Sequence, residues 1–388
     1  MKIAVVGLMR HPIAEPFAGG MESHTWWLTQ KLIERGHDVT LFASGDSDTR
    51  LNLNACTESS LETHPKAQTL LGEQACNMSA YASAIRQICH NRFDIVHNNA
   101  LHPLLLLSAA DLPVPMLMVL HAPVYPELAA AMQYAAARNA SGNLAVAAVS
   151  KSIASAWQPI IESDVVYNGV DISSWSFSAA PISNLAVWYG RFVPEKAPHL
   201  AIQAALKAGY SIQVAGPISD PTYFGAQVRP LLSHERVEYL GHLSHSQMKQ
   251  VLARASVFVN TPVWDEPYGI VYAEALASGT PVAAFNRGAA SEILDESCGA
   301  IAQAQTIESL SEAVLKAAQL SRYACRARAE SFCNIDSMVD SYERLYQQLI
   351  DRQQQNSARQ KAVLKDLKVS IARELIAQES TGPVEIAS

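Results

Sequence analysis

The chain alternates short apolar segments with amphipathic ones, and this alternation breaks once and then starts again. In the first series, strand-like segments occupy 2–7, 38–43, 95–97, 116–121 and 145–150. Helical patterns lie around 21–35, 80–91, 126–139 and 152–158. Near-continuous apolar strands are typical of a parallel sheet that helices cover on both faces. We therefore predict a doubly wound, Rossmann-like α/β domain over residues 1–175.

A stretch rich in proline, serine and alanine, residues 173–184, interrupts the pattern and indicates a linker. Strand-like segments then return over 185–190, 211–215, 237–240, 256–260 and 281–284. This restart predicts a second doubly wound domain over residues 184–334. Two such domains that face each other leave a cleft at the carboxyl ends of their strands, where ligands of these sheets bind.

The chain is expected to be helical from residue 307 onward. A core-facing stripe at helical spacing marks a helix over 335–352, and its members are Tyr342, Leu345, Tyr346 and Leu349. A second stripe lies in the tail over 353–388, and its members are Leu364, Leu367, Ile371 and Leu375. The second stripe could pack on the protein or on a second subunit, giving a homo-oligomer. A membrane-surface helix is the weaker alternative, because acidic and basic residues mix on its polar positions.

Composition excludes several classes of protein. The net charge of −7 offers no basic footprint, so we expect no nucleic-acid partner. The six cysteines show no metal-ligand spacing, which indicates free, buried thiols in a reducing cytoplasm. The apolar run 101–120 contains His102, Asp111, Pro113 and Pro115, so it predicts a helix, a turn and a strand rather than a membrane span. The segment 2–7 is too short for a signal peptide.

The segment from Trp264 to Glu274 carries the strongest functional signal. Pro267 and Gly269 predict that a helix begins near Gly269 and Ile270. Glu266 then lies on the preceding loop, and Glu274 lies on the helix, roughly 7 Å along its axis.

Between these two glutamates, the free N–H groups of the helix start form an anion site. Two hydroxyl-binding carboxylates beside a phosphate site suit the sugar, diphosphate and ribose of a nucleotide-sugar. Taken alone, this spacing of two glutamates more often reflects a structural role than ligand binding. The segment lies inside a β-α-β unit, however, and the first glutamate falls at the carboxyl end of a strand, which favours binding.

Cationic residues also follow a strand of the second domain. Arg191 and Lys196 would lie at the mouth of its sheet and could hold a diphosphate, although they could also be solvated loop charges. In the first domain, Gly19 and Gly20 precede a helix and would let a ligand approach the backbone, or form a simple turn. They do not match G-x-G-x-x-G, which disfavours a nicotinamide enzyme. His121 closes a strand, where it could bind a sugar hydroxyl.

The D-x-D pattern of Asp46-Ser47-Asp48 lies in a polar stretch, and we interpret it as a surface turn rather than a metal site. The dipeptide Asn168-Gly169 indicates another turn, which could line the hinge between the domains.

Taken together, these motifs resemble those of retaining glycosyltransferases of family 4, which have the GT-B architecture. The matching segments follow the family's order over roughly residues 1–350: Gly19–Glu22, Arg35–Val39, His121, Asn168–Asp171, Gly190-Arg191, Glu195-Lys196, Gly241, Glu266–Gly269, Glu274 and Ser291–Ile293. The family usually has a Gly-Gly pair where this chain has Arg287-Gly288-Ala289-Ala290. The tail from 353 lies outside the resemblance.

The resemblance implies a role for each site residue. Arg191 and Lys196 would hold the diphosphate, Glu274 the ribose and Glu266 the donor sugar. The resemblance also places His121 on the sugar, Gly19-Gly20 near the phosphates and the acceptor, and the base beside 237–241, which ends at Gly241. The final helix would cross back to the acceptor-binding first domain.

The expected function is therefore transfer of a hexose from a nucleoside diphosphate sugar to an acceptor hydroxyl. The anomeric configuration would be retained by front-face attack, without a metal or cofactor. Uridine is our choice of base, with guanosine next, and glucose is a guess among hexoses. The acceptor could be a saccharide, a lipid or a small molecule. Two alternatives stay open: a nucleotide-sugar epimerase on the same fold, and a catalytically inactive carbohydrate-binding homologue.

Overall fold

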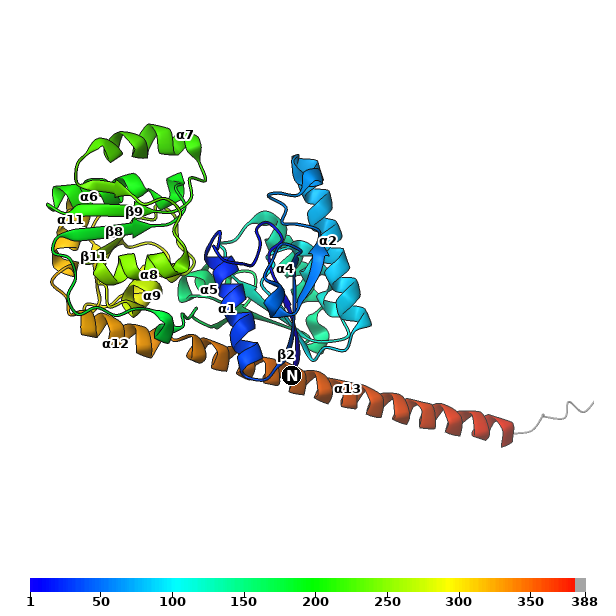
Figure 1. Ribbon diagram of the computed structural model, residues 1–388. Coiled ribbons are helices and arrows are strands. Elements are labelled where there is room, and N and C mark those ends of the chain that lie inside the picture. Colours follow the sequence, from blue (N-terminus) through cyan, green and yellow to red (C-terminus); the bar gives the residue numbers. More distant parts are fainter. Residues whose placement is uncertain (381–388) are drawn as a thin grey trace, which may run out of the picture.

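The computed structural model describes residues 1–380 and has two lobes, each built on one parallel sheet (Figure 1). The seven-stranded sheet and its helices are called the first lobe, and the six-stranded sheet and its helices the second lobe. This arrangement confirms the prediction of two doubly wound domains.

In the first lobe, the strand order is β3-β2-β1-β4-β5-β6-β7, and all neighbours are parallel. The strands are β1 (Lys2–Val6), β2 (Asp38–Ser44), β3 (Leu53–Thr57), β4 (Ile95–Asn98), β5 (Met116–Leu120), β6 (Leu144–Ala148) and β7 (Asp164–Val165). The helices are α1 (Gly20–Glu34), α2 (Leu70–His90), α3 (Pro103–Ser108), α4 (Pro126–Ala137) and α5 (Lys151–Trp157). Every residue of β4 and β5 is buried, as expected for strands covered on both faces.

Helix α2 begins ten residues before the predicted start at 80. Its first turn lacks an apolar face, because Leu70 and Leu71 are exposed. The Thr69 side chain instead caps the helix by accepting a hydrogen bond from Gly72 N at 3.1 Å.

In the second lobe, the order is β10-β9-β8-β11-β12-β13, again all parallel. The strands are β8 (Leu185–Tyr189), β9 (Ser211–Ala215), β10 (Val237–Tyr239), β11 (Val257–Asn260), β12 (Val282–Phe285) and β13 (Gly299–Ala302). The helices are α6 (Pro198–Lys207), α7 (Pro221–Tyr223), α8 (His245–Arg254), α9 (Ile270–Ala277), α10 (Ala290–Ile293), α11 (Ile307–Ala317) and α12 (Arg322–Phe332).

Strand order reverses direction beside the first strand of each lobe. β1 lies between β2 and β4, and β8 lies between β9 and β11. Crevices for ligands form outside the carboxyl ends of strands at such switch points. The loops that follow β1 and β8 are those that carry Gly19, Gly20 and Arg191.

The last helix, α13 (Ile335–Ser380), leaves the second lobe and crosses back under the first lobe (Figure 1). It packs on α1, β4 and β5. The predicted core-facing stripe is buried: Tyr342, Leu345, Tyr346 and Leu349. At the crossing, Gly169 fits against the start of the helix, because a Cβ there would lie 2.4 Å from Ile335 Cα.

The predicted tail is not a separate helix, because α13 continues through residue 352 to Ser380. The tail stripe does not pack on the described part of its own chain: Leu364, Leu367 and Ile371 are about half exposed. The side chain of Leu375 lies outside the described residues. A second subunit as its partner stays a prediction.

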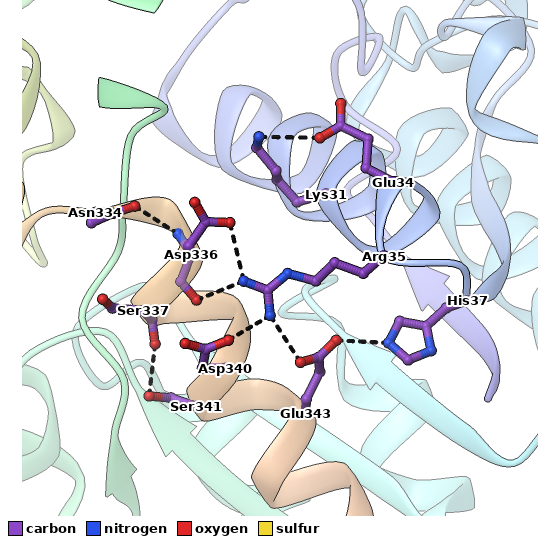
Figure 2. Close-up of polar contacts among 10 residues, drawn as sticks. All are labelled: Lys31, Glu34, Arg35, His37, Asn334, Asp336, Ser337, Asp340, Ser341 and Glu343. Carbon is purple, nitrogen blue, oxygen red and sulfur yellow. Dashed lines mark hydrogen bonds and ion pairs between the residues drawn. The ribbon is translucent and has the colours of Figure 1, made fainter. Parts of the chain in front are cut away.

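A cluster of charges fastens α13 to the end of α1 (Figure 2). Arg35 donates to Asp340 at 2.5 Å, to Glu343 at 2.9 Å and to Asp336 at 3.0 Å. His37 Nε2 lies 2.7 Å from the other oxygen of Glu343. One guanidinium therefore joins three carboxylates spaced along one face of the crossing helix.

Replacing Arg35 by alanine should lower the free energy of unfolding by about 1–2 kcal/mol, because it leaves three neighbouring carboxylates without their shared cation. Denaturant unfolding at low and high salt measures this, and the loss should shrink at high salt. The control is Arg86→Ala, an exposed arginine of α2 with no ion pair in residues 1–380. Equal effects of the two variants would contradict the anchoring role.

Within residues 1–380, no helix is both long enough and apolar enough to span a bilayer. All six cysteines are free thiols. Cys298, Cys325 and Cys333 are buried as expected, whereas Cys89 is exposed.

Candidate functional site

A cavity of about 480 Å³ lies between the two lobes, at the carboxyl ends of β1 and β8. It is lined by nearly all residues that the sequence singled out: Gly19, Gly20, His121, Arg191, Lys196, Glu266, Gly269, Ile270 and Glu274. Gly241 is not among the lining residues, although the adjacent His242 and Leu243 are. The folding of two sheets thus brings together side chains from residues 19 to 274.

The loop after β8 supplies the two predicted cations. Arg191 is exposed, and within the described residues its side chain has no ion pair or hydrogen bond. Its position depends on a close backbone contact, because a Cβ on Gly216 would lie 1.9 Å from Gly190 O. Only glycine fits at position 216, where φ is +139°. This loop therefore presents an unpaired positive charge to the cavity.

Lys196 is the second cation, and it forms an ion pair with Glu266. The same carboxylate oxygen of Glu266 accepts a hydrogen bond from Trp264 Nε1 at 3.0 Å, and the ammonium lies 5.5 Å from the Trp264 ring centroid. Both charged side chains are largely buried, at 20% and 11% exposure. Each charge is thereby held in place and partly desolvated, which strengthens its effect on a bound ligand.

Helix α9 begins where Pro267 and Gly269 predict. Gly269 precedes it with φ +79°, and a Cβ there would lie 2.6 Å from the Tyr272 ring. In residues 1–380, the backbone N–H groups of Gly269, Ile270 and Val271 have no hydrogen-bond partner. They are donors at the positive end of the helix, as an anion site requires.

Glu274 lies one turn further along α9 and accepts a hydrogen bond from the Tyr189 hydroxyl at the end of β8. It is 7% exposed. Burial raises the pKa of this carboxyl to about 7, against the opposing effects of the Tyr189 hydrogen bond and the charge of Lys249. The carboxyl is therefore fixed in the cavity and can both accept and donate near neutral pH.

This raised pKa makes stability depend on pH. The folded protein holds the Glu274 proton more tightly than the unfolded chain does, so this contribution is complete below pH 4.5 and is lost as pH rises through about 7. The difference corresponds to about 3 kcal/mol. Glu274→Gln should therefore lose less stability than the wild type between pH 5 and pH 8 in denaturant unfolding. Glu235→Gln, an exposed control, should follow the wild type; identical pH profiles for all three proteins would refute the shift.

His121 reaches the cavity from the first lobe and is held by a chain of buried hydrogen bonds. Asn99 Oδ1 lies 2.9 Å from Nε2 of His121 and 2.9 Å from Nε2 of His97. An amide oxygen only accepts, so both Nε2 atoms carry the proton. Tyr346 of α13 then donates to His97 Nδ1 at 2.6 Å. With its proton on Nε2, His121 keeps Nδ1 as a hydrogen-bond acceptor.

Burial keeps these histidines neutral. Desolvation lowers the pKa of His121 to about 3, with a smaller contribution from His97. His121 is therefore an uncharged hydrogen-bonding group rather than a cation at neutral pH.

The glycine loop after β1 meets the second lobe directly. A Cβ on Gly20 would lie 3.4 Å from Ile270 Cγ2, so the starts of α1 and α9 face each other. Near Gly19, the Glu22 carboxylate lies over the start of α1, 3.0 Å from the position of an added Cβ. The α1 start is thus already occupied by an internal anion.

Two important residues gave no recognisable sequence signal. Gly216 is a single glycine, and Asn99 matters through its hydrogen bonds to His97, His121 and Thr25. Gly288 has φ +54°, and a Cβ there would lie 1.9 Å from Glu266 O. The segment 287–290, which departs from the family pattern, therefore supports the Glu266 backbone directly.

The carboxylates of the D-x-D pattern are engaged by their own neighbourhood. Asp46 accepts a hydrogen bond from Ser60 N, and Asp48 forms an ion pair with Arg50.

Two family models match successive parts of this chain. The model of "Glycosyltransferase Family 4" matches residues 18–174, and that of "Glycosyl transferases group 1" matches residues 173–331. Glycogen synthase of Mycobacterium tuberculosis is 32% identical over 141 residues, which is 34% of each chain. D-inositol 3-phosphate glycosyltransferase of Mycolicibacterium smegmatis is 29% identical over 205 residues, 47% of each chain. These alignments span about a third to a half of the curated relatives' length.

Solved structures share the fold over nearly their whole length. Sucrose-phosphate synthase from Thermosynechococcus elongatus superposes with a TM-score of 0.73 at 18% identity, covering 90% of this chain and 99% of that one. Anabaena Alr3699/HepE in complex with UDP-glucose superposes with a TM-score of 0.68 at 20% identity, covering 90% of this chain and 100% of that one. The glycosyltransferase AviGT4 superposes with a TM-score of 0.67 at 21% identity, covering 90% of this chain and 98% of that one.

Proposed function

Because this chain belongs to glycosyltransferase family 4 and has the GT-B fold, we propose that it transfers a hexose from a UDP-sugar to an acceptor hydroxyl with retention of configuration. The observation that carries the proposal is one cavity whose second-lobe side holds an unpaired guanidinium, a lysine, a helix start with free amides and two buried glutamates, Glu266 and Glu274.

The diphosphate fits the positive part of this cavity. Arg191 offers a planar fork, Lys196 a point charge, and the amides of Gly269, Ile270 and Val271 the donors of a helix start. The departing diphosphate gains charge as its bond to carbon breaks, so these groups act mainly in the transition state. They supply the positive field that a metal ion supplies in other transferases, and no metal or cofactor is required.

The nucleoside then extends along the second lobe. Glu274, fixed by Tyr189, binds the ribose hydroxyls. The base reaches the ends of β9 and β10, where Pro217, His242 and Leu243 line the cavity. Uracil is our choice of base, and the likeness to a fold solved with UDP-glucose supports it.

The sugar lies between Glu266 of the second lobe and His121 of the first. Glu266 accepts hydrogen bonds from sugar hydroxyls while Lys196 balances its charge. His121 Nδ1 accepts one further hydrogen bond from the sugar. Glu266 is paired with Lys196, which disfavours it as a covalent nucleophile. On the resemblance to the family we infer front-face attack: the acceptor oxygen bonds to the anomeric carbon as the carbon–oxygen bond to the diphosphate breaks, and the hydroxyl proton passes to the diphosphate.

The first lobe receives the acceptor in this scheme. We place the reaction in a reducing compartment such as the cytoplasm, which fits six free thiols.

A thermal-shift screen of nucleoside diphosphates tests the donor assignment. UDP and UDP-glucose should raise the melting temperature more than GDP or ADP, because a ligand that binds only the folded protein stabilises it. Incubation with the donor alone separates the alternatives: slow hydrolysis supports a transferase, and an isomerised sugar would indicate an epimerase. No stabilisation by any nucleotide and no donor turnover would refute the proposed function.

A further inference from the structure

If the donor occupies the second lobe, the acceptor enters against the first-lobe wall of the cavity, and the charges of that wall are distinctive. Four of its lining residues are Arg10, His11, Glu22 and His121. Arg10 pairs with Glu73 at 2.7 Å, and His11 pairs with Glu62 at 2.9 Å.

The two residues that can be cationic on this wall therefore already have carboxylate partners, and His121 is neutral. A phosphate group would have to displace a carboxylate to find a cation here. The unpaired cation of the cavity, Arg191, lies on the opposite lobe, where the donor diphosphate requires it.

Glu22 has no such partner. It lies in the first turn of α1, lines the cavity and is 5% exposed. Within the described residues, its carboxylate has a hydrogen bond only with its own backbone amide. Burial raises its pKa; the backbone bond and the charges of His11 and Arg191 oppose this, and Glu62 adds to it. This buried carboxyl keeps acceptor capacity that the protein itself does not use.

Glu22 also removes the anion site that a helix start otherwise offers. Its Oε2 atom lies over the start of α1 beside Gly19. A second anion at this point would be repelled by a buried negative group. The Phe17 ring also lines the cavity, and the Trp26 ring lies at a centroid distance of 6.0 Å from it. Such a wall suits the apolar face of a hydroxylated ring.

We propose that the acceptor is an uncharged sugar or polyol, one of whose hydroxyls donates to Glu22, and that phosphorylated acceptors are excluded. This inference rests on the proposed function and specifies its acceptor. It separates this chain from relatives named for inositol 3-phosphate.

Matched pairs of acceptors test the proposal, with UDP-glucose as donor. The pairs are methyl glucoside, methyl galactoside and methyl mannoside with their 6-phosphates, and myo-inositol with its 3-phosphate. At least one neutral compound should accept the hexose, with kcat/KM about ten- to a hundredfold above that of its phosphorylated partner.

For the neutral acceptor, Glu22→Gln should raise KM about tenfold. It should also reduce the ratio between the kcat/KM of the neutral acceptor and that of its phosphorylated partner. Stabilisation by UDP shows that the variant is folded. The control is Glu127→Gln, which changes an exposed first-turn glutamate of α4 outside the cavity and should change neither value.

Transfer to phosphorylated compounds only, transfer to none of the neutral ones, or an unchanged KM in Glu22→Gln would overturn this inference while UDP binding is intact. If the wild type neither binds UDP nor turns over the donor, the proposed function itself fails, and this inference fails with it.

Discussion

Replacing Lys196 by alanine should lower the rate of donor turnover about 10²–10³-fold while weakening the binding of UDP-glucose far less. Lys196 lies in the cavity and pairs with the buried Glu266. Its charge opposes the negative charge that grows on the diphosphate, so its loss is felt most in the transition state. Initial rates and titration calorimetry with UDP-glucose measure the two quantities.

The variant also leaves Glu266 without its cation, and a double variant separates the two effects. If the loss arose only from the unpaired carboxylate, Lys196→Ala with Glu266→Gln would be as active as Glu266→Gln alone. We expect the double variant to be far less active than Glu266→Gln, because the positive field is still missing. Lys207→Ala, which breaks the exposed pair with Glu308, is the matched control and should be neutral. Unchanged turnover in Lys196→Ala would remove Lys196 from the site.

Gly288→Ala should abolish most activity through a single methyl group. The added Cβ would lie 1.9 Å from Glu266 O and 2.5 Å from Glu266 N, and φ at this position is +54°. Backbone cannot yield as a flexible side chain does, so the Glu266 loop must move. We expect turnover to fall about 10²-fold, because displacements near 1 Å have such effects. The free energy of unfolding should fall by about 2–4 kcal/mol.

Gly225→Ala is the control for this substitution. Gly225 lies in the helical segment Phe224–Val228, and nothing lies within 4 Å of its added Cβ. That variant should be as stable and active as the wild type, or slightly more stable. Full activity of Gly288→Ala would show that the Glu266 loop tolerates movement and that its position does not limit catalysis.

Much of the fold could be predicted because buried parallel strands are continuous apolar runs. β5 and β12 are apolar at every position and wholly buried, so their sequences alone indicate strands. β3, β7 and β13 were not predicted, for physical reasons. β3 lies at the edge of its sheet with the partly polar sequence LNACT, β7 has only two residues, and β13 is an edge strand with the short sequence GAIA. None of them contains enough large buried apolar side chains to leave a pattern.

The site was predictable where one short segment determines it. The start of α9 follows from Pro267 and Gly269, and with it the positions of Glu266 and Glu274 relative to the free amides. Contacts between distant segments leave no local pattern. The pairing of Lys196 with Glu266 spans 70 residues, and that of Tyr346 with His97 spans 249. The first pair is fixed by the pairing of β8 with β11 in the second lobe, and the second pair by the crossing helix, neither of which periodicity specifies.

The most direct test is a crystal structure of this protein with UDP bound. The account predicts the diphosphate within hydrogen-bond distance of Arg191, Lys196 and the amides of Gly269, Ile270 and Val271, with the ribose on Glu274. A nucleotide bound elsewhere, or reversed so that its phosphates lie away from these groups, would contradict it.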